Sequence, residues 1–149
     1  MRVVNTTAQM RDPEAGLHAL EEIQSLFHRF RVETDLVHRE QFAGDESRRG
    51  LVEQLVARQQ LASLMPKVRD LHVADMAYVL EGLPLEQRML IWSLVPDALH
   101  ANVMVELGEP VRASLIERMS REALLHMAQG LDTDDLAAMA AELPADVVE

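Results

Sequence analysis

The chain has 149 residues, no cysteine, 48% apolar residues and a formal net charge of −11. This length suits one domain, or one domain with an N-terminal arm, and the lack of cysteine excludes a disulfide framework and cysteine–zinc sites and fits a reducing compartment. Only 3% of the residues are aromatic, so the core must be built from Leu, Val, Ala and Met, a mixture that favours helices. We also expect no secretory signal in residues 1–10 and no membrane insertion, because no run of about 18 apolar residues occurs.

Three helical segments are predicted before residue 71. Residues 12–31 begin with Asp-Pro-Glu, which suits the positive end of a helix, and continue with apolar residues at helical spacing. Residues 32–42 suit a further helix, and residues 43–47 read as a loop. A helix is expected over 49–64, and Pro66 should interrupt or kink it because proline removes a backbone donor.

From residue 71 onward, an apolar residue returns at every twelfth position. We call this series the ladder: Leu71, Leu83, Val95, Leu107, Met119, Leu131 and Leu143. A second apolar line runs three residues earlier, and a breaker or capping residue follows almost every ladder position: Pro84, Pro96, Gly108, Ser120, Asp132 and Pro144. The pattern predicts short helices near 73–82, 85–95, 97–107, 109–119, 121–131 and 133–143.

A fixed period built from short helices is typical of an α-solenoid. Such helices are marginal alone in water and need neighbours that bury their apolar faces. A further line at this period contains Arg88, His100 and Arg112 among apolar residues. These polar members suggest two helices per structural repeat, with unequal burial. We therefore predict an all-α fold.

No catalytic constellation is visible in the sequence. The six histidines include no pair at helical i, i+4 spacing, the serines lack a nucleophile motif, and the glycines form no phosphate-binding loop. Ser120 is most simply an N-cap. We expect neither an enzyme nor a histidine metal site.

The negative charge gathers toward the C-terminus, where residues 106–149 hold ten acids and three bases. Such a field repels nucleic acid and attracts cations or basic partners, so we expect no nucleic-acid binding. The densest cluster contains Asp132, Asp134 and Asp135. One interpretation is a capping box in which Asp132 caps a helix. The other is a weak Mg²⁺ site, because this ion keeps most of its waters and needs only one or two carboxylates.

The segment from Leu71 to Pro84, LHVADMAYVLEGLP, resembles the opening of the cytosolic N domain of MgtE-type magnesium transporters and channels. The likeness continues through the segments 101–107, 120–125 and 131–136 and covers about residues 50–149. Val73 stands where the family usually has proline. The resemblance implies a right-handed, armadillo-like α-solenoid over 50–149 and makes residues 1–49 an N-terminal helical extension.

The resemblance also implies a function and partners. In the family, tandem CBS domains and a transmembrane pore follow the N domain, and Mg²⁺ bridges acids of the N and CBS domains to hold the gate shut. Asp134 matches one N-domain acid of that interface, and Asn102 stands where the second acid is expected. We therefore expect a cytoplasmic, Mg²⁺-sensing regulatory domain that does not conduct ions alone, with Asp132, Asp134 and Asp135 as metal residues.

Two alternatives stay open at this point. A homodimer is compatible with the family. A helical-repeat protein–protein interaction module without an ion role, of the flagellar rotor switch type or a free-standing scaffold, is the second functional reading.

Overall fold

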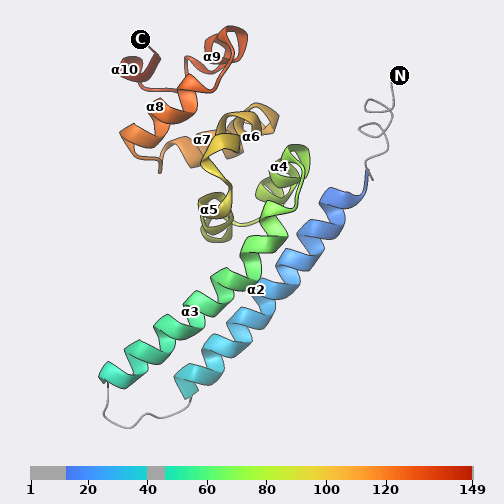
Figure 1. The fold of residues 1–149 in the computed structure, drawn as a ribbon, viewed down its shortest axis with the longest axis vertical. Coiled ribbons are helices and arrows are strands. Elements are labelled where there is room, and N and C mark those ends of the chain that lie inside the picture. The colour runs from blue at the N-terminus through green and yellow to red at the C-terminus, as the bar shows by residue number, and fades with distance from the viewer. Residues whose placement is uncertain (1–12, 40–45, 149) are drawn as a thin grey trace.

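The computed structural model describes residues 13–39 and 46–148, and these residues are helical almost throughout (Figure 1). No strand occurs among them, so the predicted all-α class is confirmed for this part of the chain. None of the described helices combines the length and the apolar character needed to cross a membrane.

Two long helices, α2 (Ala15–Arg39) and α3 (Glu46–Arg69), form an antiparallel hairpin. The predicted division of the first helix near residue 31 is wrong, because residues 30–34 contain neither Pro nor Gly and α2 continues through them. The helix start expected at Asp12 lies outside the described residues.

Pro66 does not interrupt α3. Leu64 and Val68, on either side of it, are fully buried, so packing holds the last turn in place although one backbone hydrogen bond is lost. The helix therefore ends at Arg69, after the predicted limit at residue 64. The expected domain boundary between residues 49 and 50 falls inside α3.

The rest of the chain consists of short helices: α4 (Val73–Gly82), α5 (Leu85–Leu94), the 3₁₀ turn η1 (Asp97–Leu99), α6 (His100–Glu106), α7 (Glu109–Ile116), α8 (Arg121–Gln129), α9 (Thr133–Met139) and α10 (Ala145–Val148). All lie close to the predicted ranges. The largest differences are that η1 opens the third predicted segment, that α7 and α9 end three and four residues early, and that α10 had no predicted range.

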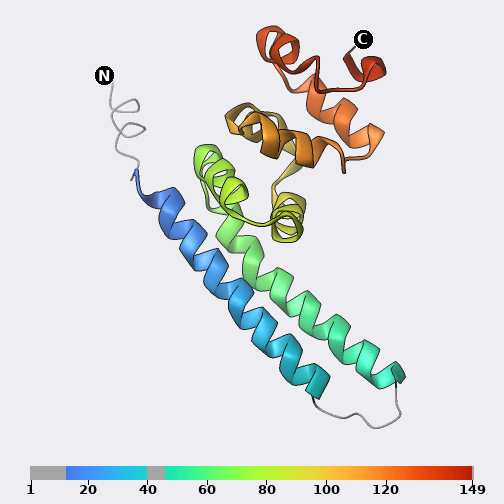
Figure 2. The same ribbon diagram turned by 180° about the vertical axis from the view of Figure 1, so that it is seen from behind.

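Alternate helices pack on one another. The helix α4 contacts α6, α6 contacts α8 and α8 contacts α10, while α3 contacts α5 and α5 contacts α7. Contacts between next-but-one helices agree with two helices per repeat. The hairpin lies at one end of this array and the C-terminus at the other (Figures 1 and 2). The right-handed superhelical winding stays a prediction.

The twelve-residue period corresponds to the helix boundaries. The residue after each of the first six ladder positions is the N-cap of the next helix, and these six share φ between −57° and −69° and ψ between 137° and 162°: His72, Pro84, Pro96, Gly108, Ser120 and Asp132. The ladder residue itself closes the preceding helix, because its N–H donates to the carbonyl three residues earlier in Val95, Leu107, Met119 and Leu131, at 3.1–3.2 Å. Each helix therefore ends in the same turn. That turn begins at a residue of the second apolar line and ends at the ladder residue three positions later.

The core follows the same period. Leu83, Val95 and Leu107 are 2–3% exposed, and Leu80 and Met104 of the second line are fully buried. Trp92 is 5% exposed, so its predicted place in the core is confirmed. The hairpin joins this core through α2, which packs on α4.

Candidate functional site

The three acids predicted to bind metal lie at the start of one short helix, α9. Asp132 is its N-cap, and Asp134 and Asp135 lie in its first turn. The backbone carbonyl of Asp132 accepts the N–H of Leu136 at 2.8 Å, as expected of an N-cap residue. Its carboxylate makes no capping hydrogen bond, so the predicted capping box is not formed.

Exposure differs among these acids. Asp132 and Asp134 are exposed, and Asp135 is half-buried. Across residues 13–39 and 46–148, no group of three or more acidic or histidine side chains is placed to hold a metal ion. With few carboxylates at hand, Mg²⁺ would keep most of its waters and take further ligands from a partner. The three acids stay a predicted site.

Asn102, which stands at the position of the second family acid, is exposed on α6. It offers one amide oxygen and no charge. Of these two helices, therefore, only α9 provides carboxylates at the positions named here, and α6 provides none.

A set of side-chain contacts that we did not predict links the repeats. Arg88 donates to the carbonyls of Leu80 and Leu83, both at 2.9 Å. Arg112, two helices later, repeats this contact at Leu107 (2.9 Å), with a longer one to Met104 at 3.5 Å. Each guanidinium thus binds carbonyls in the last turn of a preceding helix, where the intrahelical donors run out.

Arg112 also forms a two-pronged ion pair with Glu142. Nε lies 2.6 Å from Oε2 and Nη2 lies 2.8 Å from Oε1, and each side chain is only 15% exposed. The hydrogen bond from Arg112 lowers the pKa of the Glu142 carboxyl, and the same bond raises the pKa of Arg112. This pair joins α7 to the segment after α9 and so holds the acidic end of the array in place.

His100 occupies the corresponding position in the intervening helix, α6. Its Nε2 lies 3.0 Å from the carbonyl oxygen of Val95, which accepts a hydrogen bond when Nε2 carries the proton. The ring stacks on Trp92, with 4.2 Å between ring centroids. Burial lowers the pKa of His100, against the opposing effects of the Val95 carbonyl and Asp97.

The sequence did contain a signal for these contacts. Arg88, His100 and Arg112 stand at one position of the twelve-residue period, which we interpreted as unequal burial. They are only partly buried, as that interpretation expects, and each also binds the carbonyl five residues earlier, at Leu83, Val95 and Leu107. A polar residue that recurs at a fixed distance after a helix end is thus a readable sign of side-chain capping.

A family model described as the MgtE intracellular N domain matches residues 71–149, just over half of the chain. The match begins at Leu71, the first residue of the ladder. Neither a curated protein nor a solved structure matches the chain.

Proposed function

Because the chain belongs to the MgtE intracellular N domain family, we propose that residues 71–149 sense Mg²⁺ and regulate a magnesium transporter from its cytoplasmic side. The family is one of transporters, and its N domain is intracellular. In this proposal the array conducts no ions and catalyses no reaction. It is a right-handed solenoid whose acidic end presents Asp134, with Asp132 and Asp135 beside it.

The proposed mechanism is a bridge made by hydrated Mg²⁺. At high Mg²⁺ the ion joins the carboxylates at the start of α9 to acids of CBS domains in the same transporter and stabilises the closed pore. A ligand shifts such an equilibrium only by binding one state more tightly. A site divided between two domains meets this condition, because it is complete only when they approach.

The position and exposure of Asp134 carry the proposal. The side chain is exposed in the first turn of α9, within the segment 106–149 that holds ten acids and three bases. The negative field concentrates cations there. The interaction-module alternative needs no such acid at this place.

The test is an NMR titration of the whole chain with MgCl₂, with KCl of equal ionic strength as reference. We expect weak, millimolar binding, because few ligands and many retained waters give little affinity. Amide shifts should centre on residues 131–138 and fade in Asp134→Asn.

Glu122→Gln is the matched control. Glu122 lies in the first turn of α8, two residues after its N-cap Ser120, as Asp134 follows Asp132. This variant should keep the wild-type titration. In an intact transporter, Asp134→Asn should make closure require more Mg²⁺. If the Mg²⁺-induced amide shifts are unchanged in Asp134→Asn, or if both variants lose them equally, the acidic end is an ordinary solvated surface.

A further inference from the structure

The helix α3 carries two leucines on the side that faces away from the core. Leu51 and Leu55 are 62% and 58% exposed, the two largest exposed fractions among the large apolar side chains of the described residues. Leu64 and Val68, thirteen residues further along, are fully buried and mark the packed side of the same helix. Thirteen residues are about 3.6 helical turns, so the two leucines lie on nearly the opposite side of α3. Grouped exposed leucines of this kind mark an interaction site, whereas single ones are ordinary.

Two arginines lie in line with these leucines. The positions of Arg48, Leu51, Leu55 and Arg58 differ by three or four residues, the spacing that keeps side chains on one helix face. Leu51, Leu55 and Arg58 line one surface hollow together with Gln54. All five side chains are exposed. We call these five residues the outer face of α3.

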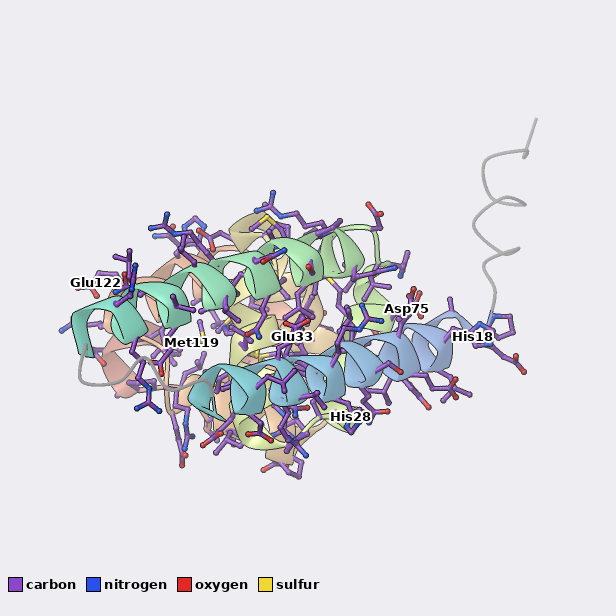
Figure 3. The ribbon with its side chains drawn as sticks, turned by 90° about the horizontal axis from the view of Figure 1, so that it is seen from below. His18, His28, Glu33, Asp75, Met119 and Glu122 are labelled. Carbon is purple, nitrogen blue, oxygen red and sulfur yellow. The ribbon has the colours of Figure 1, made fainter. Side chains whose placement is uncertain are left out.

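The outer face is separate from the groove between α2 and α3. That groove is lined from α3 by Val56, Gln59, Gln60 and Ser63, and Glu33 is among the residues that line it from α2. Glu33 lies between the two helices in Figure 3, on the inner side of the hairpin. The groove and the hollow share no lining residue, so the outer face points to solvent and not toward α2.

The outer face has a positive charge. Between residues 48 and 62 the only acid is Glu53, which lies 3.6 Å from Arg49. Glu53 follows Leu51 by two residues, about 200° around the helix, so it lies on another side of α3. Arg58 forms no ion pair with any described residue. The outer face therefore combines two leucines and two guanidinium groups with no carboxylate.

We propose that the outer face of α3 rests on the surface of a membrane that contains anionic phospholipids. The two leucine side chains enter the boundary between headgroups and acyl chains, and the arginines beside them contact lipid phosphates. Basic side chains near a membrane are attracted to anionic lipids in this way. In this proposal the contact is peripheral, and α3 does not cross the bilayer.

The shape of the outer face favours lipid over a protein partner. The hollow is formed by residues of α3 alone, so no second element builds a cleft with them that could hold the side chains of a protein. A lipid surface needs no such cleft. The proposal rests on the proposed function only in that a regulatory domain of a transporter works beside a membrane.

The distribution of charge over the molecule sets its orientation. Five bases and two acids occur in α3, whereas residues 106–149 hold ten acids and three bases. The hairpin and the C-terminus lie at opposite ends of the molecule (Figures 1 and 2). From Arg48 to Arg69, where α3 leads into the array, the helix is about 32 Å long, and the Debye length in about 0.1 M salt is about 10 Å. A tilted hairpin therefore holds the acidic end beyond the reach of the lipid charges, although the net charge of the chain is −11.

The first experiment measures co-sedimentation of the full chain with vesicles. In about 0.1 M NaCl, we expect the wild type to bind vesicles of phosphatidylcholine with about one third phosphatidylglycerol, and to stay in solution with phosphatidylcholine alone. Raising the salt to about 0.5 M should release the protein, because it screens the arginines. The buffer contains EDTA, so that no Mg²⁺ bridges protein acids to lipid phosphates.

Substitutions on the outer face should weaken this binding. Arg58→Gln should raise the dissociation constant about fivefold, and Leu51→Gln with Leu55→Gln should raise it at least about tenfold. Arg118→Gln is the control for the lost charge, because Arg118 is exposed after α7. Val105→Gln is the control for the leucines, at a residue 40% exposed on α6. Both controls should bind like the wild type, and circular dichroism checks the helix content of each variant.

The second experiment reports the surroundings of the outer face and leaves both leucines in place. The chain has no cysteine, so Gln54→Cys can carry a single environment-sensitive dye beside Leu51 and Leu55. Its emission should move to shorter wavelength on the mixed vesicles, because the dye leaves water. The same dye on Val105→Cys should show no such change.

A wild type that binds neither kind of vesicle, or that binds both equally well, would overturn the proposal. So would outer-face variants that bind like the wild type, or a dye at residue 54 that responds no more than one at residue 105. An emission change at residue 54 that depends on protein concentration without vesicles would assign the outer face to a contact between copies instead. All these measurements are made without Mg²⁺, so their failure is distinct from failure of the NMR titration of Asp134.

Discussion

The ladder residue Leu107 stabilises the fold in three ways. The side chain of Leu107 is 3% exposed, its N–H donates to the carbonyl of Met104 at 3.2 Å, and its own carbonyl accepts from Arg112 at 2.9 Å. One residue thus fills the core, closes α6 and receives the guanidinium that follows. Only the first of these roles depends on the side chain, so burial in the core explains why the residue at that place is apolar.

Truncating this residue should be costly. We expect Leu107→Ala to lower the free energy of unfolding by about 2–5 kcal/mol, the range for a buried leucine that leaves a cavity. Urea denaturation followed by circular dichroism measures it. Leu85→Ala is the comparison, because Leu85 is 37% exposed and should change stability far less. Equal effects at both positions would contradict the burial argument.

The stacked pair of His100 and Trp92 should respond to pH. The ordinary pKa of histidine is 6.5, and burial lowers that of His100, with His126 acting in the same direction. The folded protein therefore resists protonation where the unfolded chain accepts it. The contribution of the neutral His100 ring to the free energy of unfolding is fully present above pH 6.5. It is lost as the pH falls through the lower pKa of the folded state.

Trp92 is the only tryptophan, so its fluorescence reports this titration directly. We expect quenching by the imidazolium with a midpoint below pH 6.5, and no such transition in His100→Gln. A midpoint at or above 6.5 would mean that the Val95 carbonyl and Asp97, 3.8 Å from Nε2, together outweigh burial.

At the scale of the helix, the N-caps distinguish two residues that look equivalent in sequence. Ser120 Oγ accepts the N–H of Ala123 at 3.1 Å, which confirms its predicted role, whereas the carboxylate of Asp132 makes no such bond. Ser120→Ala should therefore destabilise by about 0.5–2 kcal/mol, and Asp132→Ala by less. Thermal unfolding of both variants tests the order, and the reverse order would show that Asp132 caps α9 in solution.

How far the sequence predicts each element depends on where its determinants lie. The short helices were placed closely because their N-caps and terminal apolar residues are local signals repeated every twelve residues. The continuity of α2 past residue 31 was missed, although that region contains neither Pro nor Gly. The continuity of α3 past Pro66 was missed because burial of Leu64 and Val68 outweighs the proline signal. The pairing of Arg112 with Glu142 joins residues far apart in sequence and follows only from packing.

The candidate site was predictable only in part for a similar reason. The acids of α9 were identified from composition and family likeness, and the exposure of Asp132 and Asp134 suits an ion that is shared with a partner. The other ligands of such a site lie by hypothesis on CBS domains, so no local pattern in this chain encodes them.

At the scale of the whole molecule, the hairpin and the array of short helices share one core. The helix α2 packs on α4, and Ile23 of α2 is fully buried. At Gly82 of α4, an added Cβ would clash with the side chain of Leu20 on α2, so the two helices approach closely. The family match begins at residue 71, yet α4 buries part of its apolar surface against a helix outside that match.

Ile23→Ala tests whether this contact couples the two parts. We expect a loss of about 2–5 kcal/mol in the free energy of unfolding, as for other truncations of fully buried side chains. Trp92 lies in α5, outside the hairpin, and circular dichroism reports all helices. If the chain unfolds as one cooperative unit, the fluorescence and dichroism transitions of the variant should move together. A dichroism transition that shifts while the Trp92 transition stays in place would instead show that the hairpin unfolds on its own, and that the array does not depend on α2 for its stability.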